Sequence, residues 1–353
     1  MTEGNIFLEV NQYITDFDQL YESMLKCKRN VSWKPSVKAF ALNGIENCLK
    51  MEKQLQSGTW RNRKPKPITI TYPKRRECLS IPFRDRVYQR SINDNALYPQ
   101  TTRHFIYTNI ACQKGKGPKE AMDIMRKYLR RYFINNKTNI GYVVWIDVHG
   151  YYPSMKHEAV NKCFKKLCDE DIAQMAKDVL DAQYCGDVGY NPGSQMVQIA
   201  GISLLNDLDH FIKEKLHCKS YIRYMDDMYM ITNDFEQAKQ WLQIVCDRLV
   251  ELGFEPNPKK AKVCKLDKGF NYLGFKATLS KTGRVFYNLN SQNIKHERRK
   301  LKKQVILAKK GKLSKEDIDI SYECWKAHAR WGNSYKLIQR MDNYYHNLWK
   351  EIH

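Results

Sequence analysis

Two adjacent acids, Asp226 and Asp227, lie inside the stretch SYIRYMDDMYMIT, whose other residues are mostly those of β-strands. A carboxylate pair is costly in an apolar sheet, because each charge loses its water and repels the other. A strand–turn–strand hairpin avoids this cost, since a tight turn presents both acids at its tip. A third acid, Asp147, ends the apolar run YVVWID, which reads as a buried strand. A strand, a helix and a strand pair would bring the three carboxylates together on one sheet.

Three converging carboxylates are typical of a site for two divalent cations. Mg²⁺ prefers hard oxygen ligands and shares its coordination shell with substrate phosphates. Two such ions activate a 3′-hydroxyl and stabilise the leaving pyrophosphate in an in-line phosphoryl transfer. The simpler alternative is that Asp147 ends a strand and the other two acids are turn residues. The apolar strands around all three acids favour metal binding, so we expect two Mg²⁺ ions, with Mn²⁺ able to substitute.

Periodicity predicts the elements that must position these acids. Apolar residues at three- and four-residue spacing predict helices, and several less regular segments also read as helical. The predicted helices are 16–28, 36–60, 84–99, 115–133, 156–184, 198–216, 234–252 and most of the last 60 residues. A basic, proline-interrupted stretch at 62–76 surrounds a short β segment, and residues 270–289 read as strand, turn and strand. The mixture predicts an α+β chain.

Charge narrows the class of partner. The 353 residues include 60 Lys and Arg against 38 Asp and Glu, a formal net charge of +22. A charge this large repels itself, and the usual reason for it is a polyanionic partner. The 22 Tyr and 7 Trp, often beside basic residues, suit base or sugar stacking. A solvated basic surface is the alternative, and charge alone cannot separate an enzyme from a passive binder.

Other features concern the cellular setting. No run of 18 uncharged apolar residues predicts a membrane span, and the first residues do not have the pattern of a secretory signal. The eleven cysteines form no CxxC pair and no cluster at zinc spacing. We therefore expect a protein of the reducing cytoplasm with no membrane partner.

Six motifs resemble those of reverse transcriptases, and their order along the chain is similar too, over roughly residues 60–345. YMDD resembles the palm motif, and WIDVHGYYPSM resembles the first palm motif. YPKRRECLSIPFRDRVYQ and ACQKGKGPKEAM resemble the fingers of bacterial members, while NPKKAKV and FNYLGF resemble the late palm motifs with the primer grip. The resemblance implies an α+β right-hand polymerase fold, with fingers, a palm of antiparallel sheet and helices, and a helical thumb. It divides the chain into an N-terminal helical extension (1–60), fingers (61–140), palm (141–285, with part of the fingers) and thumb (286–353).

The resemblance also assigns residues. It gives the catalytic acids as Asp147, Asp226 and Asp227. It gives the metal ligands as these three acids and Val148, and the principal ligands are Asp147 and Asp226. It gives the dNTP-binding residues as Lys74, Arg76, Tyr152, Gln198 and Lys260. It gives the primer grip as Tyr272, Leu273 and Gly274. It gives the nucleic-acid-binding residues as Lys114, Lys116, Arg298, Arg299, Lys302 and Lys303.

Several of these assignments have alternatives. Tyr152 falls at the aromatic steric gate that excludes a 2′-hydroxyl, but Tyr151 is adjacent and either ring suits a core. Lys260 matches a lysine that donates a proton to pyrophosphate, but Lys259 lies beside it. Lys74 and Arg76 match positions that hold a triphosphate, and either would also suit a generic RNA-binding face.

The subtype is less sharply indicated. In PGSQMVQIAG, Val197 stands where bacterial relatives usually have Ser, beside the expected nucleotide pocket. The tail SYECWKAHARWGNSYKLIQRM resembles diversity-generating retroelement enzymes, whereas the Val197 departure favours the enzymes of antiviral defence systems. Both types work with a structured non-coding RNA, so the expected partners are that template, cDNA, the RNA–DNA duplex and dNTPs, with an accessory protein or a second copy. The alternative of another class is a catalytically idle RNA-binding protein.

Overall fold

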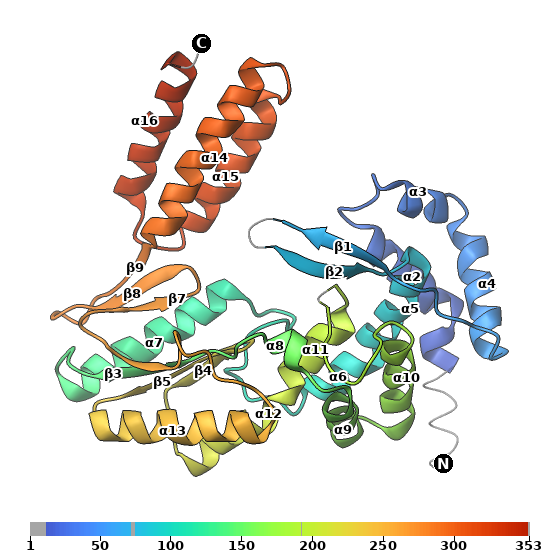
Figure 1. Ribbon diagram of the computed structural model, residues 1–353, viewed down its shortest axis with the longest axis horizontal. Coiled ribbons are helices and arrows are strands. Elements are labelled where there is room, and N and C mark those ends of the chain that lie inside the picture. The colour runs from blue at the N-terminus through green and yellow to red at the C-terminus, as the bar shows by residue number, and fades with distance from the viewer. Residues whose placement is uncertain (1–11, 72–74, 192, 352–353) are drawn as a thin grey trace.

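The computed structural model describes residues 12–71, 75–191 and 193–351. Helices and antiparallel strands are mixed along the chain, so the predicted α+β class is confirmed. Figure 1 shows a long base with a bundle of three helices rising from one end and the N-terminal helices at the other. Within the described residues, no helix has both the length and the apolar content needed to cross a membrane. All eleven cysteines are free.

A four-stranded antiparallel sheet lies in the half of the base from which the bundle rises, in the order β4-β5-β3-β6 (Figure 1). Its strands are β3 (Tyr142–Ile146), β4 (Tyr221–Tyr224), β5 (Asp227–Thr232) and β6 (Lys262–Lys265). Along β3, Val144 and Ile146 join one core, while Val143 and Trp145 join the other. Both faces are therefore covered, which is why these strands read as nearly continuous apolar runs.

Two long helices supply the covers. The helix α13 (Phe235–Glu251) contributes buried residues to the first core, and α7 (Pro118–Asn136) contributes buried residues to the second. Asp234 caps α13 by accepting hydrogen bonds from two backbone N–H groups of its first turn. The helices predicted at 115–133 and 234–252 are thus confirmed, with the first beginning after Gly117.

Two helices predicted in the middle of the chain prove to be broken. The segment 156–184 forms α9 (His157–Leu167) and α10 (Glu170–Asp181), because Cys168 adopts an extended backbone between them. The segment predicted at 198–216 begins earlier, at α11 (Gln195–Leu204), because Ser194 caps it through the N–H of Met196. It continues as α12 (Asn206–His210) and the π-helical turn η2 (Phe211–Lys215). A short helical turn, α8 (Tyr151–Ser154), follows β3.

The N-terminal end contains helices and an exposed hairpin. The helices are α2 (Phe17–Lys28), α3 (Pro35–Leu42), α4 (Gly44–Gln56), α5 (Phe83–Ile92), η1 (Asn93–Leu97) and α6 (Tyr98–Thr102). The single helix predicted over 36–60 is interrupted at Asn43. The strand β1 (Lys66–Ile70), which lies in the predicted β segment, pairs with β2 (Arg76–Ser80). The sequence did not predict β2. Only Cys78 of β2 is buried, so its residues have no apolar alternation to detect.

The segment 270–289 forms three strands rather than the predicted two. They are β7 (Phe270–Tyr272), β8 (Phe275–Leu279) and β9 (Val285–Leu289), paired in that order. Leu273 and Gly274 both have positive φ, 46° and 85°, and make the tight turn that separates β7 from β8. The last predicted division, at residue 285, falls within β9, and the division into domains stays a prediction.

Three helices, α14 (Ser291–Lys309), α15 (Lys315–Ala329) and α16 (Tyr335–Glu351), form the bundle. The chain joins it to the sheet β7–β9 at Asn290, whose N–H donates to the Gly274 carbonyl at 3.4 Å. A second junction lies at the α15–α16 turn. The N–H of Asn333 donates to the Tyr287 carbonyl at 2.7 Å, and the Tyr287 N–H donates to Oδ1 of Asn333 at 2.8 Å. A Cβ at Gly332 would lie 2.5 Å from the Tyr287 carbonyl oxygen, so only glycine permits this approach.

Candidate active site

The hairpin predicted around YMDD is confirmed. The strands β4 and β5 pair in the register Tyr224↔Asp227, so Met225 and Asp226 form the two-residue turn. Met225 has a left-handed backbone, with φ of 57°. The neighbouring strand β3 pairs with β5 in the register Ile146↔Met228, and Asp147 follows directly after Ile146. The sheet therefore brings the end of β3 beside the turn, as the sequence predicted.

A buried ion pair that the sequence did not predict holds this turn. Arg223 and Asp209 are fully buried, and two guanidinium nitrogens of Arg223 donate to the two Asp209 oxygens at 2.7 and 2.6 Å. Nη1 of Arg223 donates to the Met225 carbonyl at 2.8 Å, and Nη2 donates to the Ile202 carbonyl at 2.8 Å. The hydroxyl of Tyr221 donates to Asp209 at 2.6 Å. The planar arginine fork thus links the turn to α11 and α12.

A lysine and two polar side chains contact the candidate acids. Asp147 is 5% exposed, and its carboxylate accepts hydrogen bonds from Nζ of Lys260 at 2.9 Å and Nδ2 of Asn257 at 2.8 Å. Oδ1 of Asp227 accepts from Nε1 of Trp145 at 3.0 Å and lies 3.9 Å from Nζ of Lys260. Of the two adjacent lysines, Lys260 is the one placed against the acids. Sequence reasoning missed Asn257 and Trp145.

Negative charge is concentrated at this point. Burial, followed by the charge of Asp147, raises the pKa of Asp226 to about 6. Burial also raises the pKa of Asp227 to about 7, although Trp145 and Lys260 act to lower it. Burial lowers the pKa of Lys260, but its hydrogen bond to Asp147 and the charge of Asp227 more than offset this, so the pKa is raised. The lysine supplies one positive charge among three carboxylates.

A divalent cation matches this donor set chemically. In the part of the chain that the structure describes, no group of three or more His, Cys, Asp or Glu side chains is arranged to hold a metal ion. The Lys260 ammonium instead bridges two of the acids, as a cation does. Carboxylate oxygens with raised pKa values favour added positive charge, and they are the hard ligands that Mg²⁺ prefers. The two-ion arrangement and the inclusion of Val148 as a ligand stay predictions.

The two neighbouring tyrosines differ in their surroundings. Tyr151 is 4% exposed and its hydroxyl donates to the Gly201 carbonyl, so it is a core residue. Tyr152 is half-buried, and a Cβ at Gly201 would contact its ring at 3.4 Å. Burial and the charge of Asp226 raise the pKa of Tyr152, whereas Arg76 acts to lower it. Tyr152 therefore lies within electrostatic reach of both the turn and the hairpin β1–β2.

Other predicted nucleotide contacts vary in placement. Arg76 begins β2 and is exposed, while Lys74 lies outside the described residues. Gln198 is exposed on α11, but the preceding Val197 is fully buried. The replacement of serine by Val197 thus changes packing behind the expected pocket rather than its surface.

The predicted contacts to nucleic acid lie in three separate places: the loop before α7, the β7–β8 turn and α14. Lys114 is exposed, whereas the Lys116 ammonium is already hydrogen-bonded to the carbonyls of Tyr107 and Asn109 and to the side chain of Gln113. Tyr272 is 1% exposed, and so the primer-grip turn presents Leu273 and Gly274 instead. The four predicted cations of α14 are all exposed: Arg298, Arg299, Lys302 and Lys303. We call these four the thumb cations.

The comparison with known families bears on the activity. Residues 74–277 match the model of the reverse transcriptase (RNA-dependent DNA polymerase) family. This range contains the three acids, the hairpin turn and Lys260, and it covers more than half of the chain. No curated protein matches the chain. The chain therefore belongs to the reverse transcriptase family and is an RNA-directed DNA polymerase.

Proposed function

We propose that this enzyme makes cDNA from a dedicated structured non-coding RNA in a bacterial antiviral defence system, with Asp147, Asp226 and Asp227 as its catalytic acids. The observation that carries the site assignment is the sheet register, which places Asp147 beside the Asp226–Asp227 turn with Lys260 between two of the acids. A catalytically idle RNA binder gains nothing from three carboxylates that repel phosphates. Clustered acids therefore support catalysis over passive binding.

Divalent cations, when bound, supply Lewis acidity and orient the phosphates for in-line transfer. Asp147 and Asp226 would be their principal ligands, with Asp227 and the Val148 carbonyl completing the set. Arg223 fixes the carbonyl of Met225 and thereby the backbone that presents Asp226. Lys260, whose raised pKa keeps it protonated at neutral pH, is positioned to give a proton to the leaving pyrophosphate.

The remaining predicted contacts would select the nucleotide. The ring of Tyr152 would lie beneath the sugar and exclude a 2′-hydroxyl. Arg76, on β2, and Gln198, on α11, are both exposed and suit contacts to the triphosphate and the base edge. Lys74 is proposed for the same role from the family resemblance. Leu273 and Gly274 would support the primer end.

The defence role rests on the sequence pattern around Val197, and the charge supports an RNA partner. A net charge of +22 exceeds what a short primer–template needs, so a large RNA is the partner that fits. The free state of all eleven cysteines suits the reducing cytoplasm. The diversity-generating retroelement enzyme is the alternative, favoured by the tail at 321–341.

Primer extension on an RNA template with Mg²⁺ tests the catalytic assignment. Asp147→Ala and Asp226→Ala should each lower the rate by at least about 1,000-fold, since a lost ligand removes several kcal/mol of transition-state stabilisation. The control Asp207→Ala removes an exposed acid of α12 that pairs with Lys166 and should extend as wild type does. Extension by the Asp147 or Asp226 variant at the wild-type rate would reject the assignment.

Sequencing the nucleic acid that copurifies with the protein tests the partner. One abundant, folded RNA with matching cDNA is expected from wild type, and the RNA alone from Asp226→Ala. Bacteria that carry the gene and its flanking sequence should resist phage, and the Asp226→Ala cells should not. Equal plating on both strains would reject the defence role, and cDNA that carries many sequence changes would favour the diversity-generating alternative.

A further inference from the structure

A basic hollow opens at the N-terminal end of the molecule, away from the candidate acids. It lies between α3, the start of α5 and the segment that leads into β1, with a volume of about 440 Å³. Six cations line it: Lys34, Arg63, Lys64, Lys66, Arg84 and Arg86. No carboxylate lines it, and none of the six forms an ion pair with a described carboxylate.

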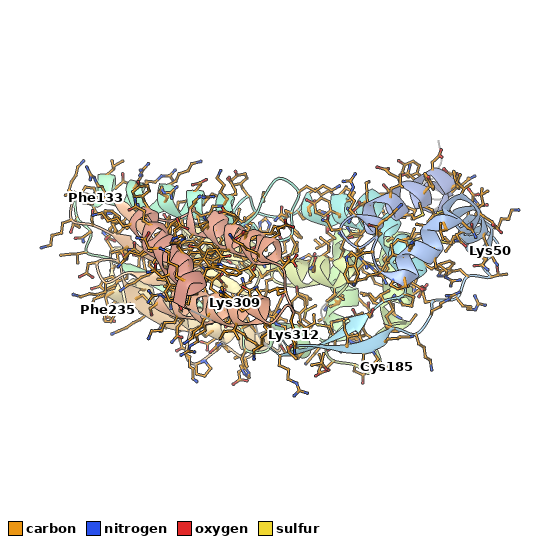
Figure 2. All side chains as sticks on the ribbon, turned by 90° about the horizontal axis from the view of Figure 1, so that it is seen from above. Lys50, Phe133, Cys185, Phe235, Lys309 and Lys312 are labelled. Atoms are coloured by element: carbon orange, nitrogen blue, oxygen red, sulfur yellow. The ribbon has the colours of Figure 1, made fainter. Side chains whose placement is uncertain are left out.

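A second hollow of about 340 Å³ continues the first. The two share Ser36, Phe40, Arg63 and Arg84, and the second adds Lys50 without adding an acid. Figure 2 shows Lys50 at the end of the molecule opposite Phe133 of α7 and Phe235 of α13. The basic surface therefore extends along the N-terminal helices, at the other end from the helices that cover the central sheet (Figure 1).

Two helix N-termini add to the positive potential. Both α3, with Lys34 at its N-cap, and α5, with Pro82 at its N-cap, lack a side-chain cap, and the first residues of both line the basic hollow. Uncapped first turns present backbone N–H groups and the positive end of the helix dipole. Two helix ends and six side chains thus converge on a space that no carboxylate lines. The nearby Asp85, in the first turn of α5, is fully buried, and its Oδ1 accepts the backbone N–H of Arg63 at 3.0 Å.

Some of these cations are held in place. The guanidinium of Arg84 stacks on the ring of Trp60 at 3.8 Å and donates to the Arg61 carbonyl, while its buried Nε has no hydrogen-bond partner. Burial lowers the pKa of Arg84, the charge of the buried Asp85 acts to raise it, and the charge of Arg63 acts to lower it. An incoming anion would offset the net lowering and could accept the hydrogen bond that Nε of Arg84 does not make.

Another hollow of the same protein shows that this imbalance is specific. The hollow between α9 and α10, about 680 Å³, has Lys162, Lys165 and Lys177 in its lining. Three acids line it as well: Glu158, Asp181 and Asp187. There the charges balance, and so the excess of cations in the basic hollow does not follow from the composition of the chain alone.

The number of charges and the apolar lining identify the anion. One phosphate group does not neutralise six cations, whereas successive phosphates of a strand do. Phe40, Phe83 and Ile81 also line the hollow, and Trp33, next to Lys34, is 74% exposed. Exposed rings beside cations suit unpaired bases, whose faces are hidden in a duplex. We propose that the basic hollow binds the phosphate backbone of a single-stranded segment of the RNA partner, apart from the polymerase site.

This inference deepens the proposed function, since it gives the RNA partner a second point of attachment. The test is the binding of fluorescent single-stranded U20 RNA, without primer, from 0.05 to 0.3 M KCl. The hollow variant carries Lys34→Gln, Lys64→Gln and Lys66→Gln, three exposed lysines whose removal leaves the stacked Arg84 in place. A charge-retaining variant carries Arg at the same three positions. The matched control carries Lys162→Gln, Lys165→Gln and Lys177→Gln.

Each phosphate contact contributes about 0.7 to the slope of log K against log salt for single strands. The hollow variant should therefore lose about 2 units of slope and about 100-fold in affinity at 0.1 M salt. The charge-retaining variant and the control should stay within about threefold of wild type, on the same reasoning. Parallel slopes for wild type and the hollow variant, or an equal loss in the control, would overturn the proposal.

Two further readouts separate related outcomes. Competition by 10 mM UMP or inorganic phosphate as strong as that of unlabelled RNA would mean a small-phosphate site and would overturn the RNA assignment. Thermal unfolding of the charge-retaining and hollow variants should match, which shows that the loss is not unfolding. Wild type that binds U20 through the hollow but makes no cDNA would refute the proposed function and leave this inference standing. cDNA synthesis by wild type, together with parallel salt slopes for wild type and the hollow variant, would refute this inference and leave the proposed function standing.

Discussion

Arg223→Met is expected to damage stability and catalysis for two separable reasons. The substitution leaves the Asp209 carboxylate fully buried with the Tyr221 hydroxyl as its remaining hydrogen-bond donor among those described. Removing one partner of a buried ion pair costs about 3–5 kcal/mol, because the other charge stays desolvated. At roughly 2–3 °C per kcal/mol for a chain of this size, the melting temperature should fall by about 10 °C.

The double variant Arg223→Met, Asp209→Leu separates the two effects. Replacing a whole buried pair by apolar side chains is often neutral, so the melting temperature should return to within about 3 °C of wild type. The Met225 carbonyl, however, still lacks the donor that it has at 2.8 Å in the native turn. A lost hydrogen bond of about 1–2 kcal/mol at the turn corresponds to about 10-fold in kcat, with the KM for dNTP changing less.

The assays are thermal unfolding and steady-state primer extension on one RNA template. A double variant that regains both stability and kcat would show that the pair only stabilises the fold. An Arg223→Met variant with the melting temperature of wild type would refute the argument from burial itself. Asp207→Ala serves again as the control, since its carboxylate is exposed and pairs with Lys166 at the surface.

Three further outcomes are expected. In metal-free protein the pKa of Asp226 is raised to about 6, so its protonated form is favoured by folding and stability falls as the pH rises from about 4 through 6. Asp226→Asn should therefore raise the melting temperature at pH 8 but not at pH 4. Added Mg²⁺ should raise the melting temperature of wild type and not that of the variant. Identical profiles of melting temperature against pH for the two proteins would contradict this reasoning. Tyr152→Ala should raise ribonucleotide incorporation in single-nucleotide extension, and an unchanged dNTP preference with surviving activity would make Tyr152 a packing residue. Changing all four thumb cations to Gln should lower the salt slope of RNA–DNA duplex binding by about one unit for each phosphate contact, measured by anisotropy, and parallel slopes would remove α14 from the duplex path.

The sequence was most informative where apolar runs surround an isolated charge. The hairpin at Asp226–Asp227 and the strand before Asp147 were predictable, because both faces of the sheet are buried and the charges stand out. The choice between Lys259 and Lys260 was not predictable. The choice depends on the conformation of the loop that contains both lysines. In this loop the carbonyl of Asn257 accepts the backbone N–H groups of Lys260 and Ala261, and its side-chain amide donates to Asp147.

Other features left little signal in the sequence. Arg223 and Asp209 lie fourteen residues apart, and a lone charge in a strand or helix usually marks a solvent-facing position. The strand β2 is mostly exposed and lacks alternation, and the break between α9 and α10 occurs without glycine or proline. The basic hollow gathers residues from three segments, so only the folded chain reveals the absence of acids.

The two junctions of the C-terminal bundle have a mechanical consequence. A body that is attached at two points rotates with least resistance about the line that joins them. Here the points are Asn290 and the Gly332–Asn333 turn, both against the sheet β7–β9. The bundle should therefore rotate as a rigid body about the axis through these two points, and this axis passes close to Gly274. Any such tilt would also shift the turn Leu273–Gly274, which we propose as the primer grip, so closure of the bundle and placement of the primer would share one degree of freedom.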